Sequence, residues 1–134
     1  MDNIWWNYIR TTVFNEMRKH MKSYNADVNC TTKDQSANPV TKFPTVYFQE
    51  IESPFMYDLT HKDVIGMRHY LRIHVFSNES TDECSDIRAE AISFLIQKYG
   101  YNATLLPVSY NGDYYTGVAQ LNRVIGGGES FAKQ

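Results

Sequence analysis

The sequence GMRHYLRIHVF, residues 66–76, carries the clearest alternating pattern in this chain. Apolar residues at every second position alternate with a row made of Arg68, Tyr70, Arg72 and His74, and His69 falls on the apolar side. Because successive side chains of a strand point to opposite faces, this pattern predicts a strand with one buried face and one face open to water or to a partner. At about 3.3 Å per residue the strand would be on the order of 33 Å long.

One amphipathic helix is predicted before this strand in the sequence and another after it. Residues 3–24 carry apolar side chains at spacings of three, four and seven, and at about 1.5 Å per residue this helix could lie along the whole strand and cover its apolar face. A second helix begins at the capping-box pattern Ser80–Glu83 and ends before Gly100, a favourable left-handed stop. Cys84 falls on its apolar stripe and is expected to be a buried packing residue.

The remaining segments complete the expected sheet. Asn25–Lys42 is predicted to be a polar loop with a short strand around Val28–Thr32, and Thr45–Ile51 is a strand rich in β-branched and aromatic residues. Glu52–Ile65 is a polar connection that would form a projecting hairpin tip if the strands beside it pair. Asn111-Gly112-Asp113 indicates a closing hairpin between strands at Thr104–Tyr110 and Tyr114–Ile125.

This order of elements predicts an α+β fold. We expect an antiparallel or mixed β-sheet with two long α-helices packed on one face, plus a projecting β-hairpin. Residues 1–125 would form a single domain, and residues 126–134 a flexible Gly-rich C-terminal tail.

The composition excludes several classes of protein. With 134 residues the chain fits one domain that needs no metal or disulfide staple, and two cysteines are too few for a four-thiolate zinc site. The balance of 13 basic against 15 acidic residues argues against a tight, sequence-independent nucleic-acid binder. No apolar run reaches the ~20 residues of a membrane span, and no signal pattern opens the chain, so a soluble protein is expected. The unusual number is the aromatic share of 14%, which is typical of proteins whose surfaces become interfaces.

The chemistry of an enzyme is not evident in the sequence. His69 and His74 lie five apart on one strand, so their side chains point to opposite faces and cannot share a metal ion. Gly126-Gly127-Gly128 does not join a strand to a helix, so these glycines do not have the position of a phosphate-binding loop. No arrangement of nucleophile, base and acid stands out. We therefore expect no catalysis, no metal and no cofactor.

Two surfaces are the candidate binding sites. The first is the open sheet face at Arg68, Tyr70, Arg72 and His74, for which an ordinary solvated face is the alternative. The second is the hairpin from Ser53 to Ile65, whose apolar side chains would need a covering protein unless the loop folds back on its own core. The candidate interface residues of this hairpin are Ser53, Pro54, Phe55, Met56, Tyr57, Asp58, Leu59, His61, Asp63 and Ile65.

Over nearly its whole length the chain resembles the tail terminator (tail-completion, head–tail joining) proteins of long-tailed bacteriophages. The resemblance rests on an N-terminal helix, on FPTVYFQEIE at 43–52, and on the long strand that runs into a helix, YLRIHVFSNESTDECSDIRAEAISFL, at 70–95. Gly100-Tyr101 and the closing hairpin LLPVSYNGDYYTGVAQLNRVIGGG at 105–128 follow. The order and spacing of these motifs carry the resemblance. The family often places a basic residue early in the last strand, where this chain has Tyr115 and Thr116, so no role is transferred to that position.

The resemblance implies a structural virion protein of the phage neck. It would form a homo-oligomeric ring, usually a hexamer, on the head-proximal end of the tail tube, stop tube polymerisation and join the tail to the connector or stopper protein. Genomic DNA would pass through the lumen without sequence-specific binding, no membrane would be involved, and assembly would take place in the host cytoplasm. By analogy, the hairpin and the Asn25–Lys42 loop would contact neighbouring subunits, the tail tube or the connector. Two alternatives stay open: another neck ring protein of the head-closure or stopper type, usually built on a small β-barrel, and a small ligand-binding or enzymatic α+β domain.

Overall fold

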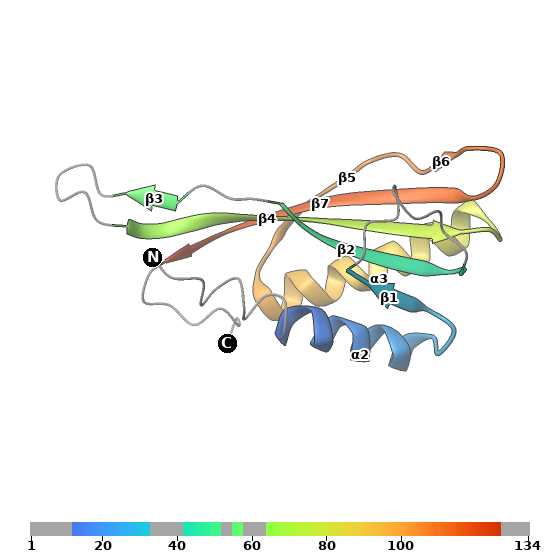
Figure 1. Cartoon of the computed structure of the whole chain (residues 1–134), viewed down its shortest axis with the longest axis horizontal. Helices are drawn as coiled ribbons and strands as arrows, with labels where there is room; N and C mark the ends of the chain where they lie inside the picture. The colour runs from blue at the N-terminus through green and yellow to red at the C-terminus, as the bar shows by residue number, and fades with distance from the viewer. Residues whose placement is uncertain (1–11, 33–41, 52–54, 58–63, 127–134) are drawn as a thin grey trace.

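The computed structural model describes residues 12–32, 42–51, 55–57 and 64–126, and it is an α+β structure (Figure 1). Within these residues seven strands form one mixed sheet. Its main path runs β1 (Asn29–Thr31), β2 (Thr45–Ile51), β4 (Val64–Ser77), β7 (Tyr115–Gly126) and β5 (Asn102–Leu105), while β3 (Phe55–Tyr57) pairs with β4 and β6 (Ser109–Tyr110) pairs with β7. β1 pairs with β2 in parallel and the other pairs are antiparallel. The α+β class and the mixed sheet are therefore as predicted.

β4 organises the sheet as its sequence pattern indicates. Leu71, Ile73 and Val75 are at most 1% exposed, whereas Tyr70, Arg72 and His74 between them are partly exposed. β2 lies along one side of β4 and β7 along the other, with Ile73 opposite both Phe48 and Ala119. Alternation thus fixes which face each neighbouring strand turns toward the core.

α3 (Thr81–Tyr99) lies against this core face, where it contacts β4 and β7. Its start is capped as predicted, because the Ser80 hydroxyl accepts a hydrogen bond of 3.0 Å from the Glu83 amide. The Glu83 carboxylate instead accepts a 2.6 Å hydrogen bond from the Ser77 hydroxyl, which ties the helix to the end of β4. Gly100 ends the helix with φ of 75°.

α2 (Phe14–Tyr24) lies beside α3, below the strands in the view of Figure 1. Met17 and Met21 enter the same buried cluster as the β4 side chains, and the Phe14 ring contacts the Phe48 ring edge-on at 5.5 Å between centroids. Val13 still has helical backbone angles and Phe14 has no side-chain cap. The predicted start of this helix at residue 3 lies outside the described residues.

α2 mainly contacts α3 and β1, whereas α3 contacts β4 and β7; the prediction that the first helix covers the whole of the long strand stays a prediction. The structure corrects two details of the sequence prediction. The connection between β2 and β4 contains the unforeseen strand β3, and β4 begins at Val64, two residues early. The strand predicted at Thr104–Tyr110 is divided into β5 and β6 at Leu106-Pro107-Val108, because proline cannot donate to the ladder.

The division of β5 from β6 is a bulge held by a buried arginine. The β5 register pairs Leu105 with Ala119, whereas β6 pairs Ser109 with Thr116, so β5–β6 has one extra residue opposite β7. Arg88 of α3 is only 8% exposed, and its Nη1 donates to the Leu106 carbonyl at 2.6 Å and to the Val118 carbonyl at 3.0 Å. The bulge is thereby fixed from the helix side of the sheet.

Candidate interface on the outer face of the sheet

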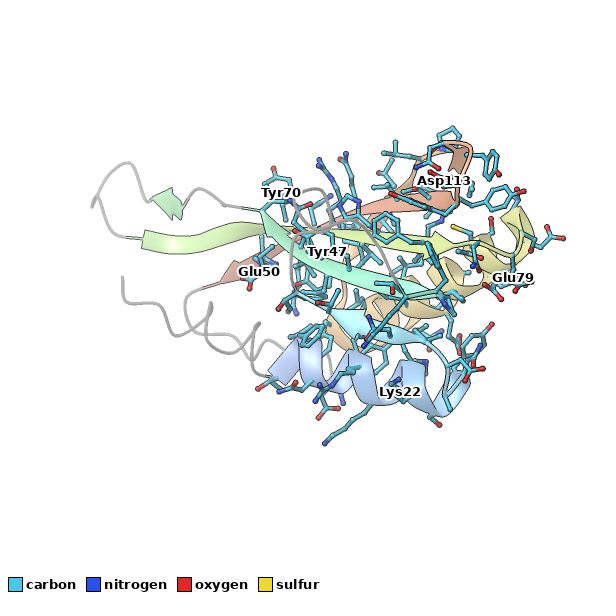
Figure 2. The ribbon with its side chains drawn as sticks, turned by 45° about the vertical axis from the view of Figure 1, so that its right-hand side comes forward. Lys22, Tyr47, Glu50, Tyr70, Glu79 and Asp113 are labelled. Atoms are coloured by element: carbon cyan, nitrogen blue, oxygen red, sulfur yellow. The ribbon has the colours of Figure 1, made fainter. Side chains whose placement is uncertain are left out.

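The face of the sheet opposite the core is the candidate site, and we refer to it as the outer face. It is formed by the alternate residues of four strands, and its members include Tyr47, Gln49, Ile51, Tyr70, Arg72, His74, Phe76, Val118, Gln120, Asn122 and Thr104. Figure 2 shows Tyr70 and Glu50, from neighbouring strands, extending to opposite sides of the sheet. No residue of the outer face given above is a carboxylate.

One end of the outer face is an aromatic cluster. The imidazole of His74 stacks on the Tyr47 ring at 5.1 Å, and its Nε2 is hydrogen-bonded to Gln49 Oε1 at 2.9 Å. Phe76 then contacts Tyr114 edge-on at 5.7 Å, and Tyr114 meets Phe43 at 5.4 Å. His74 is therefore flanked by neighbouring side chains and remains partly exposed on this face.

The middle of the outer face is a polar row across four strands. The register places Gln49, Arg72, Gln120 and Thr104 side by side, and directly opposed residues have Cβ atoms about 4.5–5.5 Å apart. Arg72 is partly buried, and its Nε is buried without a hydrogen-bond partner in the described structure. Beside it lies a pocket of about 110 Å³, which we call the Arg72 pocket. Its lining includes Ile51, Tyr70, Arg72, Thr104, Gln120 and Asn122.

A second polar group lies on the core side of β4. His69 is fully buried, and its Nδ1 is hydrogen-bonded to the Tyr101 hydroxyl at 2.8 Å. Burial lowers the pKa of His69 to about 4 and raises the pKa of Tyr101 well above its ordinary value, so both are neutral at pH 7. Arg123, opposite His69 on β7, donates to the Tyr99 carbonyl at 2.6 Å. These contacts join the end of α3 to the sheet.

The cysteines are packing residues. Cys84 is fully buried, as predicted, and its thiol donates to the Val75 carbonyl at 3.3 Å. A Cβ added to Gly117 would lie 3.0 Å from Cys84 Sγ, so the close approach of α3 to β7 favours glycine there. Burial raises the pKa of Cys84, and it raises that of Cys30 to about 11. Neither thiol is a ready nucleophile at neutral pH.

The predicted site residues are placed as follows. Tyr70, Arg72 and His74 share the outer face, and Arg68 stands opposite Val124 in the ladder. Of the hairpin, Phe55, Met56 and Tyr57 form β3, opposite Met67, Gly66 and Val64, and Ile65 belongs to β4. Ser53, Pro54, Asp58, Leu59, His61 and Asp63 lie outside the described residues, as do residues 33–41 of the predicted contact loop and 127–134 of the predicted tail.

The sequence alone did not predict which residues lie beside Arg72 on the neighbouring strands. Gln120 and Thr104 are polar residues on separate strands, and only the register of β7 with β4 and β5 brings them beside the guanidinium. The alternation of β7 predicts which of its residues share the outer face. It does not predict that Gln120 lies opposite Arg72, because that depends on the register between the two strands.

No group of His, Cys, Asp or Glu suited to hold a metal ion is found among the described residues. None of the helices in the described ranges is long and apolar enough to span a bilayer. No protein-family model and no curated protein matches the chain. The functional proposal therefore depends on the residues and their arrangement.

Proposed function

We propose that this protein is a ring-forming component of a phage neck that caps the head-proximal end of the tail tube and joins it to the connector. The proposal includes both helices covering the core face of the sheet, and a hairpin at Ser53–Ile65 that projects from the sheet and contacts a neighbouring subunit, the tube or the connector. DNA would pass through the lumen, and the role would be assembly by binding, without catalysis.

The observation that carries this proposal is the order and spacing of the elements. A helix, a strand, a 14-residue strand that runs into a 19-residue capped helix, and a closing hairpin follow one another in the order of the sequence motifs on which the resemblance to tail terminators rests. The described sheet is open, with β1 and β5 as the ends of its main path. An open sheet with two helices favours this proposal over a head-closure protein built on a small β-barrel.

The test is attachment to tube ends. Purified protein is mixed with polymerising tail-tube protein and examined by negative-stain microscopy and mass photometry. We expect rings or capped tubes of limited length. A protein that stays monomeric and never occupies a tube end would contradict the proposal.

Charge reversal of the hairpin tests the proposed contact. Asp58→Lys with Asp63→Lys is expected to reduce tube attachment, because both carboxylates belong to the proposed contact segment, while circular dichroism and the melting temperature stay close to the wild type. Reversal of Asp113, which is exposed in the turn between β6 and β7 and lies outside both proposed contact segments, is the control. Equal attachment by the hairpin variant and the control would rule out this role for the hairpin.

A further inference from the structure

We propose that the Arg72 pocket receives a carboxylate from a second copy of this chain, supplied by exposed acidic residues at the start of α3. The inference rests on the ring assembly proposed above and names one of its contacts. Its occupant is a protein side chain, and the contact is head-to-tail.

The guanidinium of Arg72 is available for such a contact. The side chain of Arg72 makes no hydrogen bond or ion pair within the described ranges, and its Nε is already out of contact with water. A buried donor left unsatisfied costs about 1–3 kcal/mol, so such groups normally have a partner in the functional state. The guanidinium matches a carboxylate especially well, because its N–H groups form parallel pairs of hydrogen bonds with the two oxygens.

The surroundings of Arg72 select the size and charge of the occupant. Gln120 and Asn122 add amide donors and Thr104 a hydroxyl, and the outer face offers no carboxylate at its described positions. A volume of about 110 Å³ equals that of three or four water molecules, at roughly 30 Å³ each. Pockets for small-molecule ligands are usually about 300–1,000 Å³. The Arg72 pocket therefore fits one acidic side chain better than a free metabolite.

The chain itself carries suitable carboxylates. Glu79, Asp82 and Asp86 are exposed, and none of their side chains has a hydrogen bond or ion pair in the described structure. Asp82 and Asp86 are four residues apart on α3, so they share one side of the helix. We refer to these three residues as the acidic start of α3. A second copy would bring three negative charges to a face on which the β4 register places two basic residues, Arg68 and Arg72.

The contact must join different copies. α3 contacts the core face of β4 and β7, whereas Arg72 lies on the outer face, so the acidic start of α3 cannot reach the pocket of its own chain. Figure 2 places Glu79 at one end of the molecule, away from Tyr70 beside the pocket. Two different surfaces that bind each other repeat head-to-tail, and such a contact closes into a ring when its rotation allows.

DNA is the less suitable occupant of the pocket. Binding to a phosphate backbone normally uses several Lys or Arg side chains along one face. The β4 register places two such residues, Arg68 and Arg72, on the outer face, and of the two it is Arg72 that lines the pocket. A single recessed guanidinium favours a discrete side chain over a repeating polyanion.

The experiment is a charge exchange followed by sedimentation velocity and mass photometry. Arg72→Glu and the double variant Asp82→Lys/Asp86→Lys should each weaken self-association at least tenfold. Lys19→Glu, a charge reversal at an exposed site on α2, is the matched control and should associate like the wild type. Circular dichroism checks folding, and Arg72→Gln replaces Arg72→Glu if the latter does not fold.

Mixing the two reversed variants gives the decisive result. In a ring in which the two variants alternate, Glu at position 72 of the first variant meets the lysines at the start of α3 of the second variant. The native Arg72 of the second variant meets the native carboxylates of the first, so every contact again joins opposite charges. We expect the mixture to assemble where each variant alone does not. Unchanged assembly of Arg72→Glu, or a mixture that stays dissociated, overturns the inference. Loss of double-stranded DNA binding by Arg72→Glu with assembly intact would identify a phosphate as the occupant and also overturns it.

These outcomes separate the inference from the proposed function. If Arg72→Glu still forms rings that cap tail tubes, the proposed function stands and the Arg72 contact is wrong. If the wild type assembles through Arg72 but never binds a tube end, the contact stands and the proposed function fails.

Discussion

Several buried polar side chains among the described residues are paired with main-chain carbonyls or with one another. Arg88 donates to two carbonyls at the β5–β6 bulge, and Arg123 donates to the carbonyl of Tyr99. His69 and Tyr101 are hydrogen-bonded to each other between β4 and the segment that follows α3. These contacts connect the helix layer to the sheet at the middle and at the C-terminal end of α3.

The buried histidine predicts a pH dependence of stability. Burial lowers the pKa of His69 to about 4, against 6.5 for an ordinary histidine. Between these values the unfolded chain binds a proton that the folded chain does not, so the free energy of unfolding decreases as the pH falls from 6.5 to 4. The loss from this group is about 3 kcal/mol at most.

Urea unfolding of wild type and His69→Gln across this pH range measures the effect. Glutamine does not titrate, so the variant should lose less stability on acidification than the wild type does. It should also be less stable than the wild type at pH 7, because the buried contact with Tyr101 is altered. Equal pH slopes for the two proteins would show that His69 does not titrate in this way.

At the scale of elements, α3 depends on its first turn. Ser80 lies in extended conformation and its hydroxyl satisfies the Glu83 amide, one of the donors that a helix start leaves without a partner. Ser80→Ala should therefore lower the free energy of unfolding by about 1 kcal/mol. Ser85→Ala is the matched control, because it removes a serine inside the same helix and should leave stability unchanged or slightly raised. Equal losses for the two variants would mean that Ser80 does not act as a cap.

Elements with a strong internal pattern were predictable from the sequence. β2 has the predicted bounds, and β4 extends the predicted strand by two residues at its start and one at its end. Both have clear alternation or β-branched composition, and the capping residues of α3 mark its ends. Local sequence preference and tertiary packing agree in these segments.

Elements that depend on a partner strand were not predictable. β3 is three residues inside a polar connection, and its pairing is provided by the early part of β4. The break between β5 and β6 depends on Pro107 together with Arg88, which comes from a distant helix. Arg88 lies on the buried side of α3, where a charged side chain is not expected unless the fold supplies acceptors. The carbonyls of Leu106 and Val118 become visible as acceptors only in the folded arrangement.

For the whole molecule, the distribution of charge is more informative than its sum. The net charge of −2 conceals a sheet face with no described carboxylate and a helix start with three exposed ones. The sequence predicted the shared face of Tyr70, Arg72 and His74, because alternation within one strand determines it. It could not predict the Arg72 pocket, because β2, β5 and β7 contribute to the pocket through their registers.

A second exposed surface offers a different way for copies to associate. The β5–β6 edge exposes Leu105, Leu106 and Tyr110, which are 53%, 38% and 57% accessible, and residues 102–110 carry no charge. Exposed edges without charge are templates for pairing with another chain. Association through this edge would depend on apolar burial, which salt does not screen.

Ionic strength separates the two surfaces. If Arg72 meets the acidic start of α3, self-association should weaken when the salt concentration rises from about 0.1 M to about 1 M, because the Debye length falls from about 10 Å to about 3 Å. Association through the β5–β6 edge should stay constant or strengthen. Sedimentation velocity across this range measures the difference, and Leu105→Lys tests the edge without touching the pocket. Salt-independent association that Leu105→Lys abolishes would assign the contact to the edge, whereas salt-sensitive association that survives Leu105→Lys assigns it to Arg72.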